Sequence, residues 1–548
     1  MGIYADSSAD EIKQLINLSD AEIVFAEDQE QIDKLLEIKG NIPQIKKVIY
    51  WDPKGLKNYA DLILMSFDEL EELGVRYEMQ HPGLFERTVE AGTADDLAVL
   101  LLTSGTTGTL PKLVMHSHCS LLGCERLYRL VQPVHEGDMY VALTPLGWGL
   151  EQVSLATSLS TGRVINLPES PETIQEDLRE IGPTMAAMLS SQVENMSSLI
   201  QARIDDATLL KRLAYRLILP IGYKRADFAL ANRKPNLLWK ALIAFADLAL
   251  FTPLRDKLGL AKTKNFINFG TVISADAARY FSALGLRPKQ VYATGEMLWI
   301  STHGDNNIKL ETVGPPLPGV EVKITEEGEI AVKKEARFLG YYKDAEKTSK
   351  VLVDGWYYTG DAGIIDEDGH LVLFDRMKDV MVLADGAKFS PQYIESRIRF
   401  CPYIKDAVVF GGGDRPFLTA LIIIDFENVA RWAARKNIAF TTFTDLSQKS
   451  QVYELIIPYI ERVNKTLSRA ARIRRFVNFY KELDPDEAEL TRTRKLRRSF
   501  FEEHYQSLIQ AIYTNQGLIP LETQIRLSDG RVKRVVTQVR IETVNHQE

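Results

Sequence analysis

Residues 97–112 read LAVLLLTSGTTGTLPK, an apolar run followed by a loop of small and hydroxyl-bearing residues that ends in a lysine. Gly105 and Gly108 permit backbone conformations that other residues avoid, and they let backbone amides approach phosphate oxygens. Lys112 adds positive charge. The spacing does not match the Walker pattern, because three residues separate Gly108 from the lysine. Taken alone, this loop is equally consistent with an ordinary turn and with a phosphate-binding site.

The segments around this loop predict an α/β domain. Residues 9–20 and 28–40 have helical patterns, and residues 21–27, 46–52 and 97–102 have strand patterns. This alternation predicts parallel strand pairing. Helices predominate from the loop to about residue 260, and strands predominate from there to 375. Beyond that point strands alternate with amphipathic helices, so we predict a large domain over residues 1–375 and a smaller α+β domain over residues 376–548.

Length and composition agree with more than one domain. A chain of 548 residues exceeds what one compact core usually holds. The formal net charge of −8 argues against a nucleic-acid-binding protein. The cysteines Cys119, Cys124 and Cys401 lack the spacing of a zinc or redox site. These features favour a reduced, cytoplasmic location.

The stretch 208–260 mixes basic and apolar residues at helical spacing. Such helices can lie on a membrane surface, or they can pack onto the protein's own core. We favour core packing, since we find no apolar run that approaches the length of a membrane span. Membrane association stays open as the alternative.

Three further stretches carry candidate site residues, and each also has a purely structural explanation. VYATGEM at 291–297 predicts a strand followed by Glu296, which can hold Mg²⁺ or simply face water. GWYYTGDAGIIDEDGHLVLFDRMKD at 355–379 presents Asp361 and Arg376, suited to ribose hydroxyls and phosphates, although a hairpin closed by an ion pair is the simpler explanation of this stretch alone. ELTRTRKLRR at 489–498 places Lys495 among arginines, as a solvated helix face also would.

The order of these stretches resembles the AMP-binding, adenylate-forming synthetase superfamily. The resembling motifs are TSGTTG with a following PK, YATGE, GWYYTGD, DRMKD, ADGAKFSPQYIE and TRTRK. LTPLGWGLEQ at 143–152 and the region around residues 371–410 narrow the resemblance to long-chain fatty acyl-CoA synthetases. It covers essentially the whole chain. It implies a large AMP-binding domain, incomplete at its N-terminus, joined by a hinge at Asp375–Arg376 to a small mobile C-terminal domain.

The resemblance also implies a reaction and its residues. A long-chain fatty acid and ATP, with Mg²⁺, would give an acyl-adenylate and pyrophosphate, and coenzyme A would then displace AMP. Lys495 and Glu296 are the implied catalytic residues, and Thr103 and Glu296 the implied Mg²⁺ ligands. The implied ATP and coenzyme A contacts are Thr103, Ser104, Gly105, Thr106, Thr107, Gly108, Lys112, Gly270, Thr271, Tyr292, Thr294, Asp361, Arg376, Gly386 and Lys388. The acyl pocket would lie near Trp148 and residues 185–260. The same resemblance is compatible with a homodimer and with peripheral membrane contact.

Several positions depart from the family pattern. The loop has one extra residue before Pro111, and Leu113 replaces a glycine. The family's Y-G-x-T-E reads Tyr292–Glu296 as YATGE, and its Gly-Gly-Ala reads Phe-Gly-Thr at 269–271. Losing one hydrogen bond to a charged group costs about 1.5–3 kcal/mol, so the departures predict a slower enzyme rather than an inactive one. MGIYADSS at the start corresponds to a point inside the family's large domain, so we expect the first strands and helices of that domain to be missing.

Two other functions remain as alternatives. A non-catalytic homologue would retain affinity for nucleotide or acyl groups without turnover. An adenylating enzyme with an acceptor other than coenzyme A is disfavoured by the family-like ADGAKFSPQYIE at 384–395.

Overall fold

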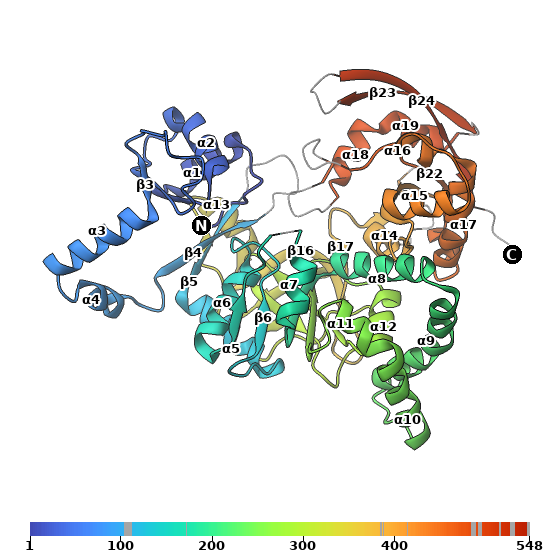
Figure 1. The fold of residues 1–548 in the computed structure, drawn as a ribbon, viewed down its shortest axis with the longest axis horizontal. Helices are drawn as coiled ribbons and strands as arrows, with labels where there is room; N and C mark the ends of the chain where they lie inside the picture. The colour runs from blue at the N-terminus through green and yellow to red at the C-terminus, as the bar shows by residue number, and fades with distance from the viewer. Residues whose placement is uncertain are drawn as a thin grey trace.

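The computed structural model describes residues 1–103, 112–170, 172–383, 386, 388–413, 415–483, 489–490, 496–514, 517–526 and 532–544. Figure 1 shows the N-terminal elements at one end of the molecule and the C-terminal elements at the other, with the central strands and helices between them. This arrangement agrees with the prediction of a large α/β part followed by a smaller α+β part.

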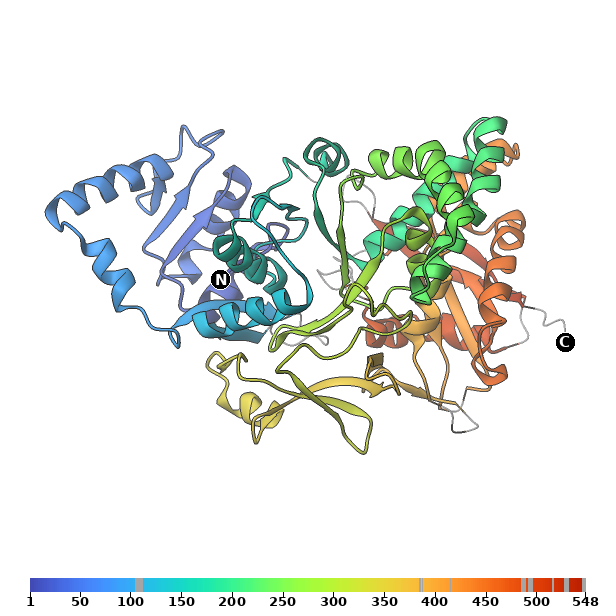
Figure 2. The ribbon, with the colours of Figure 1, turned by 90° about the horizontal axis from the view of Figure 1, so that it is seen from below.

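The N-terminal part is a parallel sheet with its own core. Its strands are β1 (Ile23–Ala26), β2 (Lys47–Tyr50) and β3 (Leu64–Ser66), which pair in this order. Its helices are α1 (Ala9–Ser19), α2 (Gln29–Glu37), α3 (Phe67–Gln80) and α4 (Leu84–Ala91). Ile16, Ile32 and Val48 are buried between α1, α2 and the sheet. The predicted helices, strands and parallel pairing of this part are confirmed. α3 and α4 stand away from the body in Figures 1 and 2.

A second, mostly parallel sheet lies at the centre, and its strand order is β11-β10-β9-β8-β6-β7. The strands are β6 (Met139–Val141), β7 (Val164–Asn166), β8 (Met185–Leu189), β9 (Asn265–Phe269), β10 (Pro288–Thr294) and the antiparallel β11 (Leu298–Thr302). The helices around it are α5 (His118–Val131), α6 (Gly149–Thr161), α7 (Ile174–Ile181), α8 (Ser190–Asp205) and α12 (Ala275–Leu284). Because β9 and β10 are parallel, the loops that follow them, at residues 270–273 and 295–297, leave the same edge of the sheet.

Antiparallel strands complete the large part. One sheet contains β4 (Leu97–Thr103), β5 (Lys112–Ser117) and β14 (Gly340–Tyr341). Another contains β12 (Glu321–Ile324), β13 (Glu329–Lys333), β15 (Leu352–Val353), β16 (Trp356–Ile365) and β17 (Leu371–Arg376), with α13 (Ala345–Val351) beside it. The predicted strand at 97–102 is β4. It pairs with β5 so that Thr103 lies opposite Lys112.

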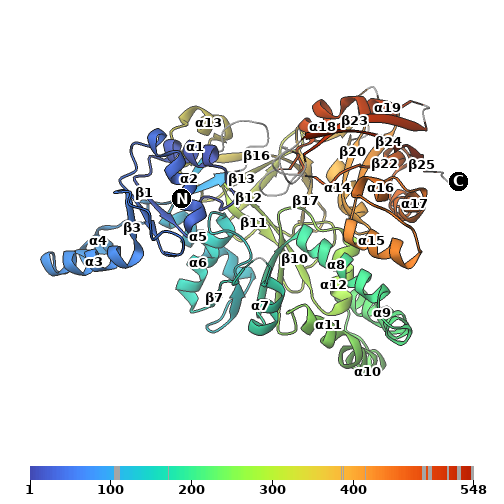
Figure 3. The same cartoon turned by 45° about the horizontal axis from the view of Figure 1, so that its top comes forward.

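The C-terminal part has a mixed sheet and a separate core. The sheet order is β20 (Ile404–Phe410), β21 (Leu418–Ile424), β22 (Ile473–Asn478) and β25 (Glu542–Thr543). Two hairpins accompany it, β18 (Met381–Val382) with β19 (Lys388–Phe389) and β23 (Leu518–Arg526) with β24 (Val532–Arg540). Its helices are α14 (Pro391–Ile398), α15 (Phe426–Arg435), α16 (Phe443–Ser447), α17 (Ser450–Asn464), α18 (Arg498–His504) and α19 (Gln506–Ile512). The view in Figure 3 separates this part from the central sheet. The α+β prediction for it is confirmed.

The stretch 208–260 forms helices that only partly pack on the core. They are α9 (Leu209–Leu230), α10 (Leu237–Ala246), the π-helical turn η2 (Asp247–Phe251) and α11 (Thr252–Lys257). Tyr215, Gly222 and Phe251 are buried, but many of the leucines are exposed. Moreover, Leu237–Lys257 is long and apolar enough to cross a membrane by length and composition alone, the one such segment in the described part of the chain. The expectation that no segment reaches that length was therefore wrong. The predicted packing onto the core holds for only one face of these helices.

Candidate active site

Tyr341 connects two of the predicted site residues, Lys112 and Glu296. The pairing of β14 with β5 brings it close to Lys112. The Tyr341 hydroxyl donates to Oε1 of Glu296 at 2.7 Å, and Nζ of Lys112 lies 3.5 Å from the same hydroxyl and 4.6 Å above the ring. The Glu296 side chain is almost fully buried. A carboxylate, a phenol and an ammonium group therefore meet just beyond the carboxyl end of β10.

Asp361 is held between Tyr292 and Arg376. The Tyr292 hydroxyl donates to Oδ2 of Asp361 at 2.6 Å, and Nη1 of Arg376 lies 3.1 Å from Oδ1. Asp361 and Arg376 are direct neighbours across β16 and β17, so strand register places this ion pair. Arg376 also donates to the carbonyl of Thr359 at 3.2 Å. The structure thus brings together three predicted nucleotide-binding residues.

Tyr357 lies near both groups. Glu296, Tyr341 and Tyr292 are all close enough to contribute to the shift in its pKa. Burial, and then the charge of the neighbouring carboxylate, raises the pKa of Tyr292, Tyr341 and Tyr357 well above the ordinary tyrosine value. The three phenols therefore stay protonated at neutral pH. Glu296 and Asp361 each accept a hydrogen bond from a phenol, which fixes the position of the carboxylate.

Gly295 allows Thr103 to approach the Glu296 turn. A Cβ atom at position 295 would lie 2.6 Å from Cγ2 of Thr103, closer than side chains can pack. The family pattern has a threonine at this position. In this chain, the clash with Thr103 explains why a glycine stands there instead. The neighbouring Thr294 accepts a hydrogen bond from the Met297 amide at 3.0 Å, which fixes the turn. Thr103, Thr294 and Glu296 therefore lie close together at the end of β10.

His116 supports this turn from within the core. Its Nε2 lies 2.7 Å from the carbonyl of Gly295, and its Nδ1 lies 2.9 Å from Oγ of Ser120. A carbonyl can only accept, so the ring donates through Nε2 and is satisfied in its neutral form. Burial lowers the pKa of His116 to about 4.

The neutral His116 predicts a loss of stability in acid. Its unfolded-state pKa is about 6.5, so its contribution is fully present above that pH and is lost as the pH falls toward 4. We expect about 3 kcal/mol less stability at pH 4 from this group. His116→Gln keeps a donor but cannot titrate, so its unfolding midpoint should fall less steeply between pH 7 and 4.5. His118→Gln, at an exposed neighbouring position, is the control. Equal pH slopes for wild type and His116→Gln would refute the assignment.

The predicted adenine stretch forms a turn after β9. Gly270 is exposed with φ of +93°, a left-handed conformation that favours glycine. The Thr271 carbonyl accepts hydrogen bonds from Oγ of Ser190 at 2.6 Å and from Nε2 of Gln290 at 3.0 Å. Trp148 packs edge-on against Phe269, with ring centroids 6.4 Å apart. The turn is thus braced by α8, β10 and the start of α6.

The remaining predicted residues lie in other places. Ser104, Gly105, Thr106, Thr107, Gly108 and Lys495 fall outside the described residues. Gly386 is exposed between β18 and β19 with φ of +84°, and Lys388 lies in β19. Both belong to the C-terminal part.

Comparison with known proteins identifies the family. Residues 1–342 match the family described as AMP-binding enzyme, and residues 378–517 match the family described as AMP-binding enzyme C-terminal domain. The first match spans more than half of the chain.

The chain belongs to the AMP-binding enzyme family. Its match to both domains confirms the predicted resemblance and the fold of a large N-terminal domain followed by a C-terminal domain.

Several known proteins are similar over most of this AMP-binding chain. The long-chain-fatty-acid–CoA ligase FadD15 of Mycobacterium bovis is 26% identical over 518 residues, which is 94% of this chain and 84% of the relative. The long-chain-fatty-acid–CoA ligase ACSBG1 of Rattus norvegicus is 26% identical over 94% of this chain and 74% of its own length.

Solved structures share the fold. The adenylation domain of a carboxylate reductase from Mycobacterium chelonae has a TM-score of 0.68 at 20% identity, covering 93% of this chain and 76% of that one. ATP-bound MatB from Rhodopseudomonas palustris has a TM-score of 0.59 at 18% identity, covering 92% and 83%.

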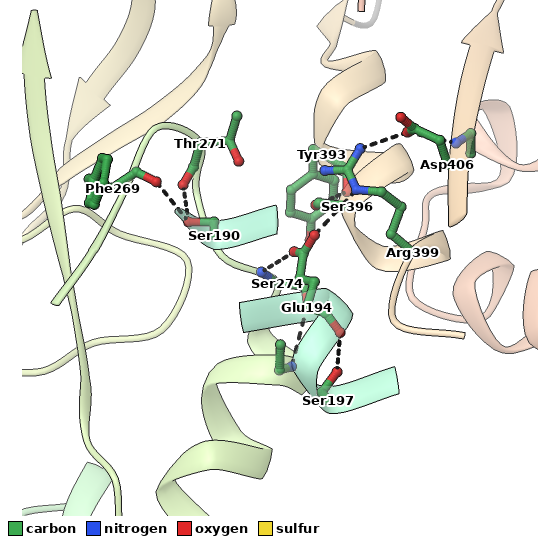
Figure 4. Close-up of polar contacts among 12 residues, drawn as sticks. Ser190, Glu194, Ser197, Phe269, Thr271, Ser274, Tyr393, Ser396, Arg399 and Asp406 are labelled. Atoms are coloured by element: carbon green, nitrogen blue, oxygen red, sulfur yellow. Dashed lines mark hydrogen bonds and ion pairs between the residues drawn. The ribbon is translucent and has the colours of Figure 1, made fainter. Parts of the chain in front are cut away.

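An ion-pair relay joins the two parts of this AMP-binding enzyme (Figure 4). Glu194 of α8 is fully buried, and it lies 3.2 Å from Nε of Arg399, just after α14. Arg399 also reaches Asp406 at 3.3 Å, and the Ser274 amide donates to Glu194 at 3.3 Å. Burial raises the pKa of Glu194 even though Arg399 opposes the shift. The relay therefore holds α14 against the large part in the conformation described.

A cavity of about 420 Å³ opens beside this relay. Its walls come from residues 272–275, from β17, from α14 and from residues 466–471, so both parts contribute to it. It adjoins the Thr271 turn but is not lined by Glu296 or Asp361. It is thus separate from the site of Glu296 and Asp361.

Sequence reasoning missed Tyr341, Tyr357 and His116 as members of the site. Tyr357 stands inside the quoted GWYYTGD, but the stretch was interpreted only through Asp361. Tyr341 lies in FLGYYK at 338–343, far along the chain from its partners Lys112 and Glu296. His116 lies within β5, directly after the apolar residues 113–115, and could have been noticed as a polar residue in a buried strand.

Proposed function

We propose that this protein is an ATP-dependent long-chain fatty acid:CoA ligase that works through an acyl-adenylate. The observation behind the proposal is that two groups of side chains lie close together at the carboxyl end of the central sheet: Lys112 and Glu296, linked through Tyr341, and the ion pair of Asp361 with Arg376. Family membership and the CoA ligases among its relatives support the reaction. The long-chain substrate rests on the relatives' names and on the sequence resemblance.

Each member of the network has a role that suits its chemistry. Asp361, held by a hydrogen bond from Tyr292, would accept the ribose hydroxyls, and Arg376 would stay beside it. Lys112 and the loop at 104–108 would bind the β- and γ-phosphates. The Thr271 turn would line the adenine. Lys495 would bridge the carboxylate and the α-phosphate during attack, where positive charge lowers the barrier.

Thr103 and Glu296 would hold Mg²⁺. Their oxygen atoms suit a hard cation, and the missing side chain of Gly295 leaves room for Thr103 beside the turn that carries Glu296. Bound there, the ion would neutralise charge on the phosphates. The described residues contain no group of three or more His, Cys, Asp or Glu that could hold a metal, so ATP would supply further oxygens.

We place the domain boundary at the end of β17, at Asp375–Arg376. This point lies between the two family matches. Rotation of residues 376–548 about it would exchange Lys495 for the segment 384–391 at the site, with Gly386 and Lys388 then facing coenzyme A. The contact between Glu194 and Arg399 would have to open or re-form during that rotation.

Product analysis over a range of acids tests the proposal. The enzyme is supplied with ATP, Mg²⁺, coenzyme A and a mixture of short, medium, long-chain and aromatic acids, and acyl-CoA products are identified by mass spectrometry. We expect long-chain acyl-CoA with one AMP per product. Preference for a short or aromatic acid would reject the long-chain substrate but keep the ligase. AMP without any acyl-CoA would favour another acceptor, and absence of AMP would favour a non-catalytic homologue.

A further inference from the structure

The helices α9 and α10 expose two apolar stripes. On α9 the stripe is Leu209, Leu210, Leu213 and Leu217, and on α10 and η2 it is Leu237, Leu238, Phe245 and Leu248. Their side chains are 55–86% exposed. Their spacing of three, four and seven residues places each set on one face of its helix. Figure 1 shows α10 at the edge of the molecule, projecting away from the body.

The same segment is strongly basic. Residues 208–264 contain twelve Lys and Arg and three Asp, a formal charge of +9 in a chain whose net charge is −8. The exposed cations on and between α9 and α10 are Lys211, Arg216, Lys224, Arg233, Lys234 and Lys240. Exposed leucines and exposed cations on one helical hairpin are the pattern of helices that lie at the interface of an anionic membrane.

The far end of this segment is fastened to the protein. Asp247 pairs with Arg225 at 2.7 Å and with Arg255 at 3.3 Å, and both arginines also donate to backbone carbonyls at the end of α12. Phe251 is fully buried. A helix that crossed a bilayer would have to break these contacts and bury Lys240 and Asp247 in hydrocarbon. The segment is therefore built to lie on a membrane rather than to cross it.

We propose that α9 and α10 dock this protein onto the surface of an anionic lipid bilayer. The exposed leucines and Phe245 would enter the headgroup region while the lysines and arginines contact anionic headgroups. A second copy of the chain fits less well, because a two-fold contact through this surface would bring one basic segment against another. The proposal does not depend on the proposed ligase activity.

Sedimentation with lipid vesicles tests the proposal without ATP or fatty acid. The full chain is mixed with vesicles of phosphatidylcholine alone or of phosphatidylcholine with phosphatidylglycerol, at low and high salt. We expect binding to the anionic vesicles that weakens with salt. Leu237→Gln with Leu248→Gln should lower the partition coefficient roughly a hundredfold. Lys234→Glu with Lys240→Glu should lower it roughly tenfold or more, and on anionic vesicles only.

A matched pair elsewhere provides the control. Leu62 and Leu159 are 89% and 81% exposed and lie outside the segment, so Leu62→Gln with Leu159→Gln should bind like wild type. All variants change exposed positions and should keep the wild-type unfolding midpoint. Wild type that stays in the supernatant with anionic vesicles, or a Leu237/Leu248 variant that sediments equally, would overturn the proposal. If the wild type is a dimer and the Leu237/Leu248 variant is a monomer, the surface would instead bind a second copy of the chain.

Discussion

Lys495→Ala should lower the rate of acyl-adenylate formation by roughly 10²–10³-fold, because a cation aimed at the α-phosphate stabilises charge that develops only in the transition state. The equilibrium binding of ATP should change much less, since the loop at 104–108, Lys112 and Asp361 would still contact the nucleotide. Rapid-quench measurement of acyl-AMP in the absence of coenzyme A separates the two effects.

The second half-reaction provides the internal control for this variant. A synthetic acyl-adenylate supplied with coenzyme A should be converted by Lys495→Ala at nearly the wild-type rate, because the domain rotation that we propose withdraws this lysine. Arg494→Ala changes a neighbouring cation of the same basic run and should retain adenylate formation. If Arg494→Ala lost as much adenylate formation as Lys495→Ala, Lys495 would contribute only general positive charge and not a specific contact with the α-phosphate.

Asp361→Asn should weaken nucleotide binding by roughly a hundredfold, because hydrogen bonds from ribose to a charged acceptor contribute about 1.5–3 kcal/mol each. The amide would also leave Arg376 without its ion-pair partner at 3.1 Å and would put an NH₂ group within reach of the Tyr292 hydroxyl. Isothermal titration with ATP and with AMP measures the effect. AMP should lose as much affinity as ATP, since both carry the ribose.

Asp368→Asn is the matched control for Asp361. Asp368 belongs to the turn after β16, is exposed, and pairs with Lys309 on the surface. We expect unchanged nucleotide affinity and at most a small change in stability, as is usual for an exposed pair. If AMP bound Asp361→Asn as tightly as wild type, the carboxylate would be only a partner that orders Arg376 and Tyr292.

Local sequence patterns predicted the parts of the fold that local physics determines. The predicted helix at 9–20 is α1 (Ala9–Ser19), which forms because Ser8 and Glu11 cap it reciprocally and Ile12 and Ile16 face the sheet. The pairing of Asp361 with Arg376 follows from two adjacent strands joined by a short turn. These features are short-range, and the residues that make them are near one another in the chain.

Long-range contacts could not be predicted in the same way. Tyr341 reaches Lys112 across 229 positions, and His116 reaches Gly295 across 179. No periodicity or spacing relates such residues, because their proximity arises only when separate sheets pack together. The pattern of 208–260 likewise indicated which residues share a helix face, but whether that face is covered depends on the rest of the fold. Several of its leucines, Leu209 and Leu237 among them, are exposed, whereas Leu260 is buried.

Carboxylate-dependent exchange of labelled pyrophosphate into ATP measures adenylate formation at this site. It needs no coenzyme A and detects the reversal of the first half-reaction alone. We predict exchange by wild type that requires Mg²⁺ and a long-chain fatty acid, with exchange by Lys495→Ala close to the level without acid. Wild-type exchange no higher than that of Lys495→Ala with every acid tried would contradict this prediction.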